Sequence, residues 1–200
     1  MLVAARPLVL ASASPARLRL LRDAGLDPLV LVSGVDEAAV ERDDPQELVA
    51  ELAARKAGAV AEKAPPEALV VGCDSLLVLD GTAFGKPASD EDALRLWQSL
   101  RGRDGLLATG HCVFDTATGR TAAAVATTVV RFGCPTDDEL AAYVGSGEPM
   151  HVAGGFTLDG RSAPFLRGVD GDAGNVIGLS LPLLRDLLAR LDVRITDLWC

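Results

Sequence analysis

Residues 8–21 have the sequence LVLASASPARLRLL, and this stretch decides the fold class. The apolar run 8–11 is typical of a short buried strand, and leucines at helical spacing follow it. Between them, Ser14 can cap a helix whose first residue is Pro15, and Gly25 stands just past its end. The sequence therefore predicts a strand, a tight turn and a helix, which is the opening of an α/β fold.

The rest of the chain continues the alternation of predicted strands and helices. Apolar runs predict strands at 29–32, 69–72 and 76–79, and β-rich runs predict a long hairpin within 106–132. Apolar periodicity and caps predict helices at 45–64, 89–100, 137–144 and 181–191, with a Gly-rich loop at 147–172. We therefore expect an α/β fold with a mixed sheet flanked by helices.

Composition excludes several classes of protein. The chain has 200 residues, 49% hydrophobic and 24% charged, as in ordinary soluble globular proteins. Its net charge of -9 argues against nucleic acid or an anionic membrane as a partner. Residues 1–7 lack the features of an export signal, no apolar stretch is long enough to span a membrane, and the four cysteines are scattered. These features predict a cytoplasmic protein with reduced thiols.

The turn between the first strand and helix offers a seat for phosphate. It contains Ser12 and Ser14, and Arg17 follows one turn into the helix. Free backbone N–H groups, the helix dipole, hydroxyls and a guanidinium together suit an anionic group. The alternative is that these serines only cap the helix.

Carboxylates supply a second set of candidates. Asp74 interrupts an apolar run, where a charged group is costly unless it is paired or functional. The acidic pair Asp36-Glu37 lies in a predicted loop. Such groups can hold Mg²⁺, and one of them can deprotonate an attacking water. The alternatives are a turn between two hairpin strands for Asp74 and a solvated turn for the acidic pair.

Lysine is scarce, with only Lys56, Lys63 and Lys86 among 19 basic residues, which mildly favours roles that need a compact ammonium. Lys86 lies in the stiff sequence Gly-Lys-Pro, where a fixed cation could neutralise a polyphosphate. The alternative is an ordinary surface lysine. His111 and His151 lack a partner at ligand spacing, so no chemical role is predicted for either.

Taken together, the motifs resemble the Maf family of nucleotide pyrophosphatases. The matching stretches cover nearly the whole chain in order: LVLASASPARLRLL (8–21), VDE (35–37), LAARKA (52–57), VVGCDSLLVLDG (70–81), GKP (85–87), TGH (109–111), YVGSGEPMHVAGGF (143–156) and GNVIGLSLPLL (174–184). The resemblance implies one domain, residues 1–200, like that of inosine triphosphate pyrophosphatases, with two lobes around a cleft and often a homodimer. It also implies cytoplasmic hydrolysis of a nucleoside triphosphate to the monophosphate and pyrophosphate with Mg²⁺ or Mn²⁺, and a link to cell-division arrest and to removal of non-standard nucleotides.

The resemblance also assigns roles to residues. Asp74 matches the proton acceptor, with Glu37 beside it for the metal, and the phosphate-handling positions match Ser12, Arg17, Lys56 and Lys86. Ala16 stands where many members have a second arginine, and Ser75 stands where the base-preference groups differ. The preferred base therefore stays open between dTTP or UTP and 7-methylguanosine triphosphate. An inosine triphosphate type of pyrophosphatase and a non-catalytic nucleotide-binding regulator of division remain as alternatives.

Overall fold

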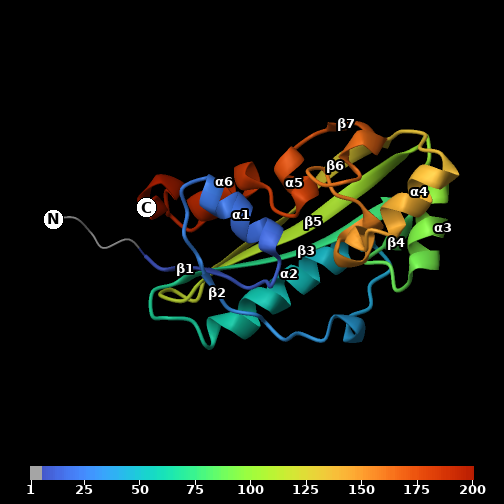
Figure 1. Cartoon of the computed structure of the whole chain (residues 1–200). Helices are drawn as coiled ribbons and strands as arrows, with labels where there is room; N and C mark the ends of the chain where they lie inside the picture. The colour runs from blue at the N-terminus through green and yellow to red at the C-terminus, as the bar shows by residue number, and fades with distance from the viewer. Residues whose placement is uncertain (1–5) are drawn as a thin grey trace. The chain divides into compact units, whose positions relative to one another are not determined.

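The computed structural model describes residues 6–200 (Figure 1). Residues 1–5, part of the segment predicted not to be an export signal, lie outside the described residues. The strands are β1 Leu8–Leu10, β2 Leu29–Val30, β3 Leu69–Leu79, β4 Thr82–Phe84, β5 Asp104–Asp115, β6 Thr121–Phe132 and β7 Leu166–Asp170. The helices are α1 Pro15–Asp23, α2 Pro45–Ala61, α3 Asp90–Leu100, α4 Asp137–Val144, α5 Ala173–Ile177 and α6 Leu181–Arg190. Short 3-10 turns are η1 Glu37–Ala39, η2 Glu148–His151, η3 Ala153–Gly155, η4 Ala163–Phe165 and η5 Ile195–Leu198.

The strands form one mixed sheet. Its order is β2-β1-β3-β5-β6-β7, with β4 paired to β3. Strand β1 runs parallel to β2 and β3, whereas β4 is antiparallel to β3 and β7 is antiparallel to β6. The predicted α/β fold with a mixed sheet flanked by helices is therefore confirmed.

Two compact units divide the chain, and each takes several segments of the sequence. The first unit comprises residues up to Asp74, 109–126 and 178–200, and the second comprises 75–108 and 127–177. Both are described separately below. The single domain with a cleft, expected from the resemblance, stays a prediction.

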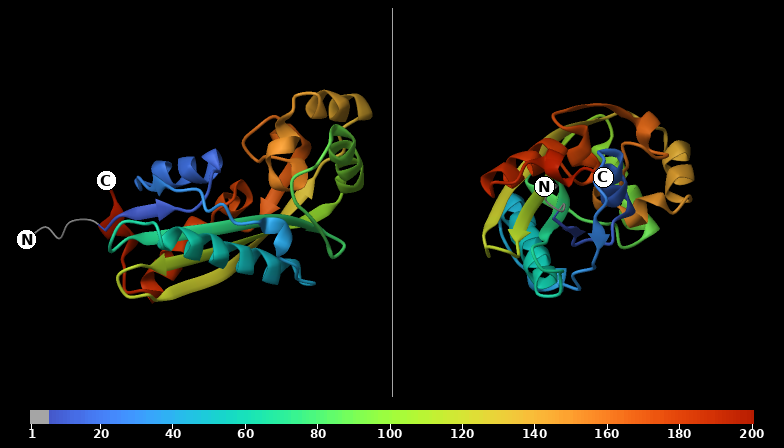
Figure 2. Two further views of the ribbon diagram at one scale, coloured as in Figure 1. Left: turned by 90° about the horizontal axis from the view of Figure 1, so that it is seen from below. Right: turned by 90° about the vertical axis from the view of Figure 1, so that its left-hand side faces the viewer.

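In the first unit, helices cover both faces of the sheet. The side chains of β1 alternate between these two faces. Leu8 and Leu10 pack with leucines of α1 and α6, while Val9 and Ala11 pack with Ala53 and other residues of α2. Figures 1 and 2 show α2 on the opposite side of this part of the sheet from α1 and α6. This two-sided burial explains why the sequence of β1 has no polar residue.

Helix α2 lies unusually close to the sheet at two glycines. A Cβ on Gly72 would lie 2.2 Å from the carbonyl oxygen of Ala53, and one on Gly110 would lie 2.1 Å from that of Val49. Distances this short against backbone atoms leave no room for any side chain. The helix is therefore held directly against β3 and β5 by main-chain contact.

The second unit has an aromatic core around Trp97 of α3. Its ring makes edge contacts with Phe132, Tyr143 and Phe165, at centroid distances of 5.6, 5.5 and 6.0 Å. The indole N–H donates to the carbonyl oxygen of Gly155 over 2.8 Å. This core fixes the Gly-rich segment of the second unit.

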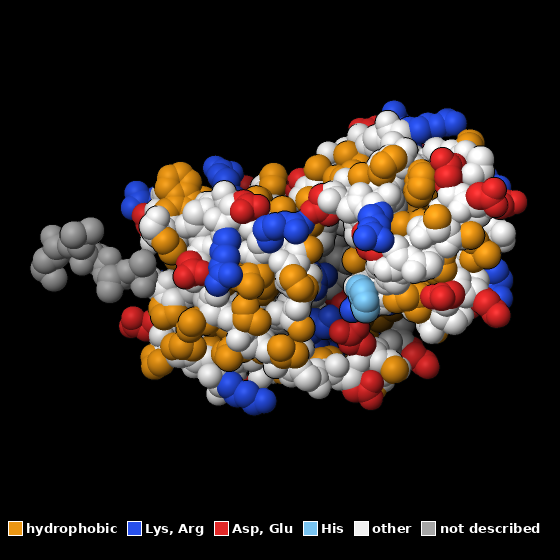
Figure 3. Space-filling view, in the orientation of Figure 1, with side chains coloured by type: hydrophobic (Ala, Val, Ile, Leu, Met, Phe, Trp, Pro, Cys, Tyr) orange, Lys and Arg blue, Asp and Glu red, His pale blue; other side chains and the backbone are white. Residues whose placement is uncertain are grey.

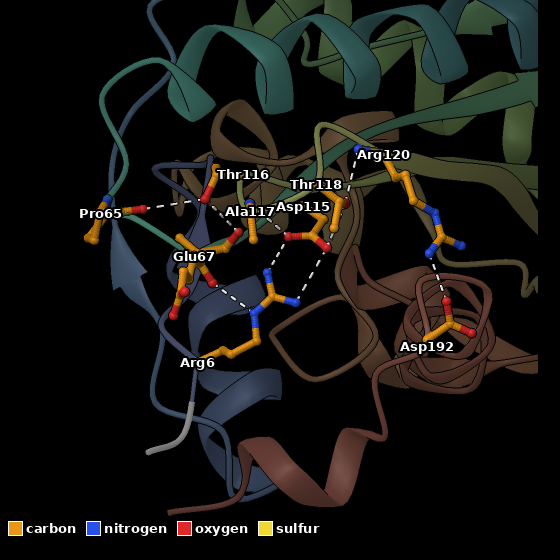
Figure 4. A network of polar contacts seen from close by, with 10 residues as sticks. Arg6, Pro65, Glu67, Asp115, Thr116, Ala117, Thr118, Arg120 and Asp192 are labelled. Carbon is orange, nitrogen blue, oxygen red and sulfur yellow. Dashed lines mark hydrogen bonds and ion pairs between the residues drawn. The ribbon is translucent and has the colours of Figure 1, made fainter. Parts of the chain in front are cut away.

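The turn between β5 and β6 is closed by a polar network in the first unit (Figure 4). Asp115 accepts hydrogen bonds from Arg6, from the Thr118 hydroxyl over 2.9 Å and from the Ala117 N–H over 3.0 Å. Arg6 also donates to the carbonyl oxygen of Glu67 over 2.8 Å. The network ties the start of β1 to the end of the predicted hairpin.

The structure departs from the sequence-based expectations in several places, and it contains two short elements that were not predicted, β4 and α5. The runs 69–72 and 76–79 belong to one continuous strand, β3, so the alternative of a hairpin turn at Asp74 is wrong. Strand β7 lies within the segment predicted as loop, where it pairs with β6. Helix α2 ends at Ala61 rather than at residue 64. Within residues 6–200, no helix is both long enough and apolar enough to cross a membrane.

Candidate functional site

Asp74 lies in the middle of β3, in the first unit, and is 7% exposed. Lys56 of α2 is equally buried, and its Nζ lies 2.5 Å from Oδ1 of Asp74. The close approach of α2 at Gly72, two residues before Asp74, brings these side chains together. The structure thus joins two predicted site residues that are 18 positions apart in the sequence.

Glu37 contacts the same lysine. Its Oε1 lies 2.7 Å from the Lys56 ammonium, and its side chain is 58% exposed. Asp36 caps this segment by accepting a hydrogen bond from the Ala38 N–H over 3.2 Å. The two acidic residues therefore differ in role, because Asp36 stabilises the turn and Glu37 contacts Lys56.

The surroundings of Asp74 shift its pKa. Burial raises the pKa of the carboxyl above its ordinary value, and the negative charge of Glu37 adds to this effect. Lys56 and Arg17 act in the opposite direction without cancelling the effect of burial. A carboxylate with a raised pKa, held in place by an ammonium, is suited to accept a proton near neutral pH.

The turn before α1 is built as the sequence predicts. The Ser14 hydroxyl caps the helix by accepting from the Arg17 N–H over 3.4 Å. The Ser12 hydroxyl accepts from the Ser14 N–H over 3.2 Å and from Nη1 of Arg17 over 3.1 Å. Both serines are therefore part of the turn's own structure, with Ser12 also orienting the guanidinium.

Two backbone oxygens complete the setting of Arg17. Its Nε donates to the carbonyl of Gly178 over 2.8 Å, and Nη1 donates to the carbonyl of Cys73 over 3.0 Å. Cys73 directly precedes Asp74, so the guanidinium is fixed beside the strand that carries the carboxyl. The sequence did not indicate these partners, because main-chain carbonyls carry no side-chain signal.

The carboxylates of the site are chemically suited to a divalent cation. Among the residues that the structure describes, no three or more His, Cys, Asp or Glu side chains form a metal cluster. Glu37 and Asp74 nevertheless converge on one ammonium, which shows that both carboxylates face a common position. Mg²⁺ is commonly bound by one or two carboxylates, with waters and substrate phosphates as its other ligands.

Lys86 belongs to the second unit, in the loop between β4 and α3. It is exposed and lines a hollow of about 480 Å³ together with Arg95 and Ser99. The preceding Gly85 is anchored, because its carbonyl oxygen accepts from the Gly154 N–H over 2.8 Å. The loop is thus fixed within its own unit, and the role of Lys86 beside the first-unit residues stays a prediction.

The two histidines differ sharply in their surroundings. His151 is exposed in the second unit, whereas His111 is fully buried in the first. His111 makes hydrogen bonds with both ring nitrogens, to main-chain atoms of Thr109 and Ser180. The sequence predicts no chemical role for His111, because Thr109 and Ser180 contact it through main-chain atoms.

Comparisons with known proteins agree with the family motifs. Residues 7–191 match the family model of Maf-like proteins. A "HAM1 protein" of Coxiella burnetii of known structure aligns with a TM-score of 0.48 and 15% identity, over 92% of this chain and 99% of that one. A protein of Streptomyces coelicolor named "Nucleoside triphosphate pyrophosphatase" is 68% identical, over 97% of this chain and 95% of that protein. A protein of the same name from Streptomyces avermitilis is 63% identical, with the same coverage. The family model and these relatives confirm the resemblance found in the sequence.

Proposed function

Because this chain belongs to the Maf family, we propose that it is a nucleoside triphosphate pyrophosphatase, which releases the nucleoside monophosphate and pyrophosphate. The observation that carries the proposal is the buried carboxyl of Asp74. It has a raised pKa and lies 2.5 Å from the Lys56 ammonium. A binding module does not need such a proton acceptor.

In the proposed reaction, Asp74 acts as the general base. A water oxygen attacks the α-phosphorus and forms a new P–O bond, while its proton passes to the Asp74 carboxylate. The bond between the α-phosphorus and the oxygen that bridges to the β-phosphorus breaks, and pyrophosphate leaves with that electron pair. Lys56 keeps Asp74 in position and, by its positive charge, opposes the rise in the pKa of Asp74 that burial causes, which favours the carboxylate that acts as base.

Cations and hydroxyls of this chain hold the phosphates. Arg17 supplies a guanidinium that is already oriented by three hydrogen bonds, which lowers the entropic cost of binding. Ser12 and Ser14 lie in the turn before α1. The free N–H groups at the N-terminus of that helix are therefore available to the same phosphates. Lys86, which the family resemblance assigns to phosphate handling, would neutralise charge on the leaving group.

A divalent metal, Mg²⁺ or Mn²⁺, would be held by Glu37 and Asp74. When bound, it would supply positive charge that offsets the developing negative charge on the phosphate oxygens. The variant Glu37→Gln should therefore need about tenfold more metal for half-maximal activity, since one charged ligand is lost. Unchanged metal dependence in that variant would remove Glu37 from the metal site.

Charge must act locally in this protein. On the face shown in Figure 3, Lys and Arg side chains are interspersed with Asp and Glu rather than gathered in one patch. With a net charge of -9, the molecule as a whole repels a triphosphate. Attraction therefore depends on the local cations and the metal, within about 8–10 Å at physiological salt.

The proposal is tested by measuring products from a panel of nucleotides with Mg²⁺ and with Mn²⁺. The panel contains dTTP, UTP, 7-methylguanosine triphosphate, ITP and XTP. Release of pyrophosphate and the monophosphate is expected, whereas release of orthophosphate would mean attack at the γ-phosphorus and a different reaction. Binding of nucleotide without any turnover would support the non-catalytic regulator of division instead.

The same panel separates the possible substrates. Preferred turnover of dTTP or UTP would assign the pyrimidine group, and preferred turnover of 7-methylguanosine triphosphate would assign the modified-nucleotide group. Turnover of ITP or XTP far above the others would favour the inosine triphosphate type. We expect a role in removing non-standard nucleotides, with arrest of cell division as the cellular consequence to be examined.

We also propose that the enzyme acts in the cytoplasm as a homodimer. Strand β2, at the edge of the sheet, exposes Leu29 and Val30, and Val32 follows it at 64% exposure. Exposed apolar side chains beside an unpaired strand edge are suited to contact with a second copy. The mass in solution measured by light scattering tests this, and a Val30→Lys variant should shift it toward the monomer.

A further inference from the structure

We propose that His111 is a positioning residue for Arg17, acting through the backbone segment 178–180. The inference rests on the proposed function in one respect only, which is that Arg17 binds phosphate. All the residues involved belong to the first unit. The contacts form a chain from His111 to Ser180, then to Gly178, and from its carbonyl to Arg17.

The hydrogen bonds of His111 define its tautomer. Nε2 lies 2.8 Å from the Ser180 backbone nitrogen, and an N–H can only donate, so Nε2 is the acceptor. Nδ1 lies 3.0 Å from the Thr109 carbonyl oxygen, which can only accept, so Nδ1 carries the proton. The ring is therefore neutral, and both of its nitrogens are used to connect β5 to the segment before α6.

Segment 178–180 is held at three points. His111 fixes the N–H of Ser180, and the hydroxyl of Ser180 caps α6 by accepting from the Leu183 N–H over 3.2 Å. Leu179 is fully buried in the core cluster that includes Leu10 and Leu184. The carbonyl of Gly178, two residues from the histidine contact, is positioned by these restraints.

Gly178 also sets the position of Arg17 by its shape. Its φ is +128°, and a Cβ built on it would lie 3.3 Å from Nε and 3.5 Å from Cγ of Arg17. The glycine backbone therefore lies against the arginine side chain, and its carbonyl oxygen accepts a hydrogen bond from the Arg17 Nε–H over 2.8 Å. A small shift of this segment would move the guanidinium or break its hydrogen bond.

Two substitutions of His111 separate positioning from simple packing. In His111→Gln, the terminal oxygen can replace Nε2 as acceptor for Ser180, whereas His111→Asn is too short and restores only the contact with Thr109. We expect the dissociation constant for inorganic pyrophosphate to rise about tenfold in His111→Asn, because the buried Ser180 N–H loses its acceptor and the segment that positions Arg17 is released. In His111→Gln it should stay within about threefold of the unsubstituted protein.

The decisive measurement is a double-mutant cycle with Arg17→Ala, read by calorimetry with inorganic pyrophosphate and Mg²⁺. If His111 acts through Arg17, the effect of His111→Asn on binding should vanish once Arg17 is absent. Equal effects of His111→Asn in both backgrounds would overturn the proposal. Gly178→Ala, which crowds the same guanidinium, provides a second cycle if His111→Asn does not fold.

A matched control is Asp115→Asn, another buried polar residue of the same unit. It should lower the unfolding temperature without changing pyrophosphate binding, and an effect on binding like that of His111→Asn would also count against the proposal. The test does not depend on turnover. If no nucleotide releases pyrophosphate but the cycle shows coupling, the proposed reaction fails and the positioning role stands. If the unsubstituted protein binds no pyrophosphate, the positioning role fails.

Discussion

Two buried carboxylates of the first unit, Asp74 and Asp115, have similar surroundings but opposite shifts in pKa. Both are less than 10% exposed, and each is paired with a basic side chain, Lys56 for Asp74 and Arg6 for Asp115. Yet the pKa of Asp74 is raised and that of Asp115 is lowered. Burial next to a cation therefore does not by itself decide whether a carboxylate has a structural or a chemical role.

Two things make the difference, namely the number of fixed donors and the extent of desolvation, which is greater at Asp74. Burial alone would raise the pKa of Asp115, but hydrogen bonds from Arg6, Thr118 and the Ala117 N–H outweigh it (Figure 4). At Asp74 the desolvation of the carboxyl is the largest influence, and Lys56 with Arg17 only partly offsets it. A carboxylate saturated by donors holds its charge, whereas one with few donors is ready to take up a proton.

The largest expected effect is that of Asp74→Asn. The turnover number for pyrophosphate release should fall roughly 10²-fold or more, because the general base is lost, while nucleotide binding is kept. The matched substitution Asp115→Asn should leave turnover within about twofold. Similar losses in both variants would break the comparison, since the two carboxylates would then not differ in role.

The variant Lys56→Gln removes the cation beside Asp74 and so tests how this ammonium affects the pKa of the carboxyl. Because the ammonium lowers the pKa of Asp74, its loss should raise that pKa further and move the acid limb of the kcat/KM profile to higher pH. At pH values on that acid limb, kcat/KM should fall about tenfold for each pH unit by which the limb moves. Lys63→Gln, at an exposed lysine of the same region, serves as control. If the acid limb of the kcat/KM profile does not move in Lys56→Gln, Lys56 does not influence the pKa of the group that titrates.

Gly72→Ala tests the packing that joins Lys56 to Asp74. A methyl group 2.2 Å from the Ala53 carbonyl must displace α2, so the free energy of unfolding should fall by about 1–3 kcal/mol or more, together with turnover. Gly58→Ala is the control, because its Cβ would meet nothing within 4 Å and alanine is the better helix former. Urea unfolding and pyrophosphate release measure both effects, and a Gly72→Ala protein as active and stable as the control would refute the close contact.

The smallest effect on catalysis, and a distinct effect on stability, is expected at Asp115. Asp115→Asn should cost about 1–2 kcal/mol of unfolding free energy at neutral pH, because hydrogen bonds to a charged group are lost. Since the folded pKa is lowered, the stability that ionised Asp115 contributes is present above its unfolded pKa, near 3.9, and is lost as the pH falls through the folded value. The stability difference between the variant and the parent protein should therefore shrink below about pH 4. A difference that does not decrease as the pH is lowered below about 4 would contradict this assignment.

Much of the fold follows from local signals in the sequence. The cap at Ser14 and the proline after it set the start of α1, and α4 has the predicted bounds. Strand β7 was missed because its five residues, two of them exposed, lack an apolar alternation and gain their structure from pairing with β6. The continuity of β3 was ambiguous because Asp74 looks like a turn residue unless the partner on α2 is known.

The site was predictable to the extent that side chains carry it. Lys56 and Asp74 were identified from motifs, and the structure shows them in contact. The carbonyls of Cys73 and Gly178, which orient Arg17, could not be found from residue types because every residue has a carbonyl. Likewise, the partners of His111 are main-chain atoms that only the tertiary structure brings together.

The main-chain contact of α2 with the sheet, at Gly72 and Gly110, has a consequence for how this enzyme can evolve and fail. Most cores absorb change through a layer of interlocking side chains that can exchange volume with one another. At these two glycines no such layer separates α2 from the sheet. The backbone spacing between the helix with the ammonium and the strand with the carboxyl is consequently set by main-chain contact. Adaptation to new nucleotides has to occur elsewhere, and loss of activity on heating should coincide with loss of the fold.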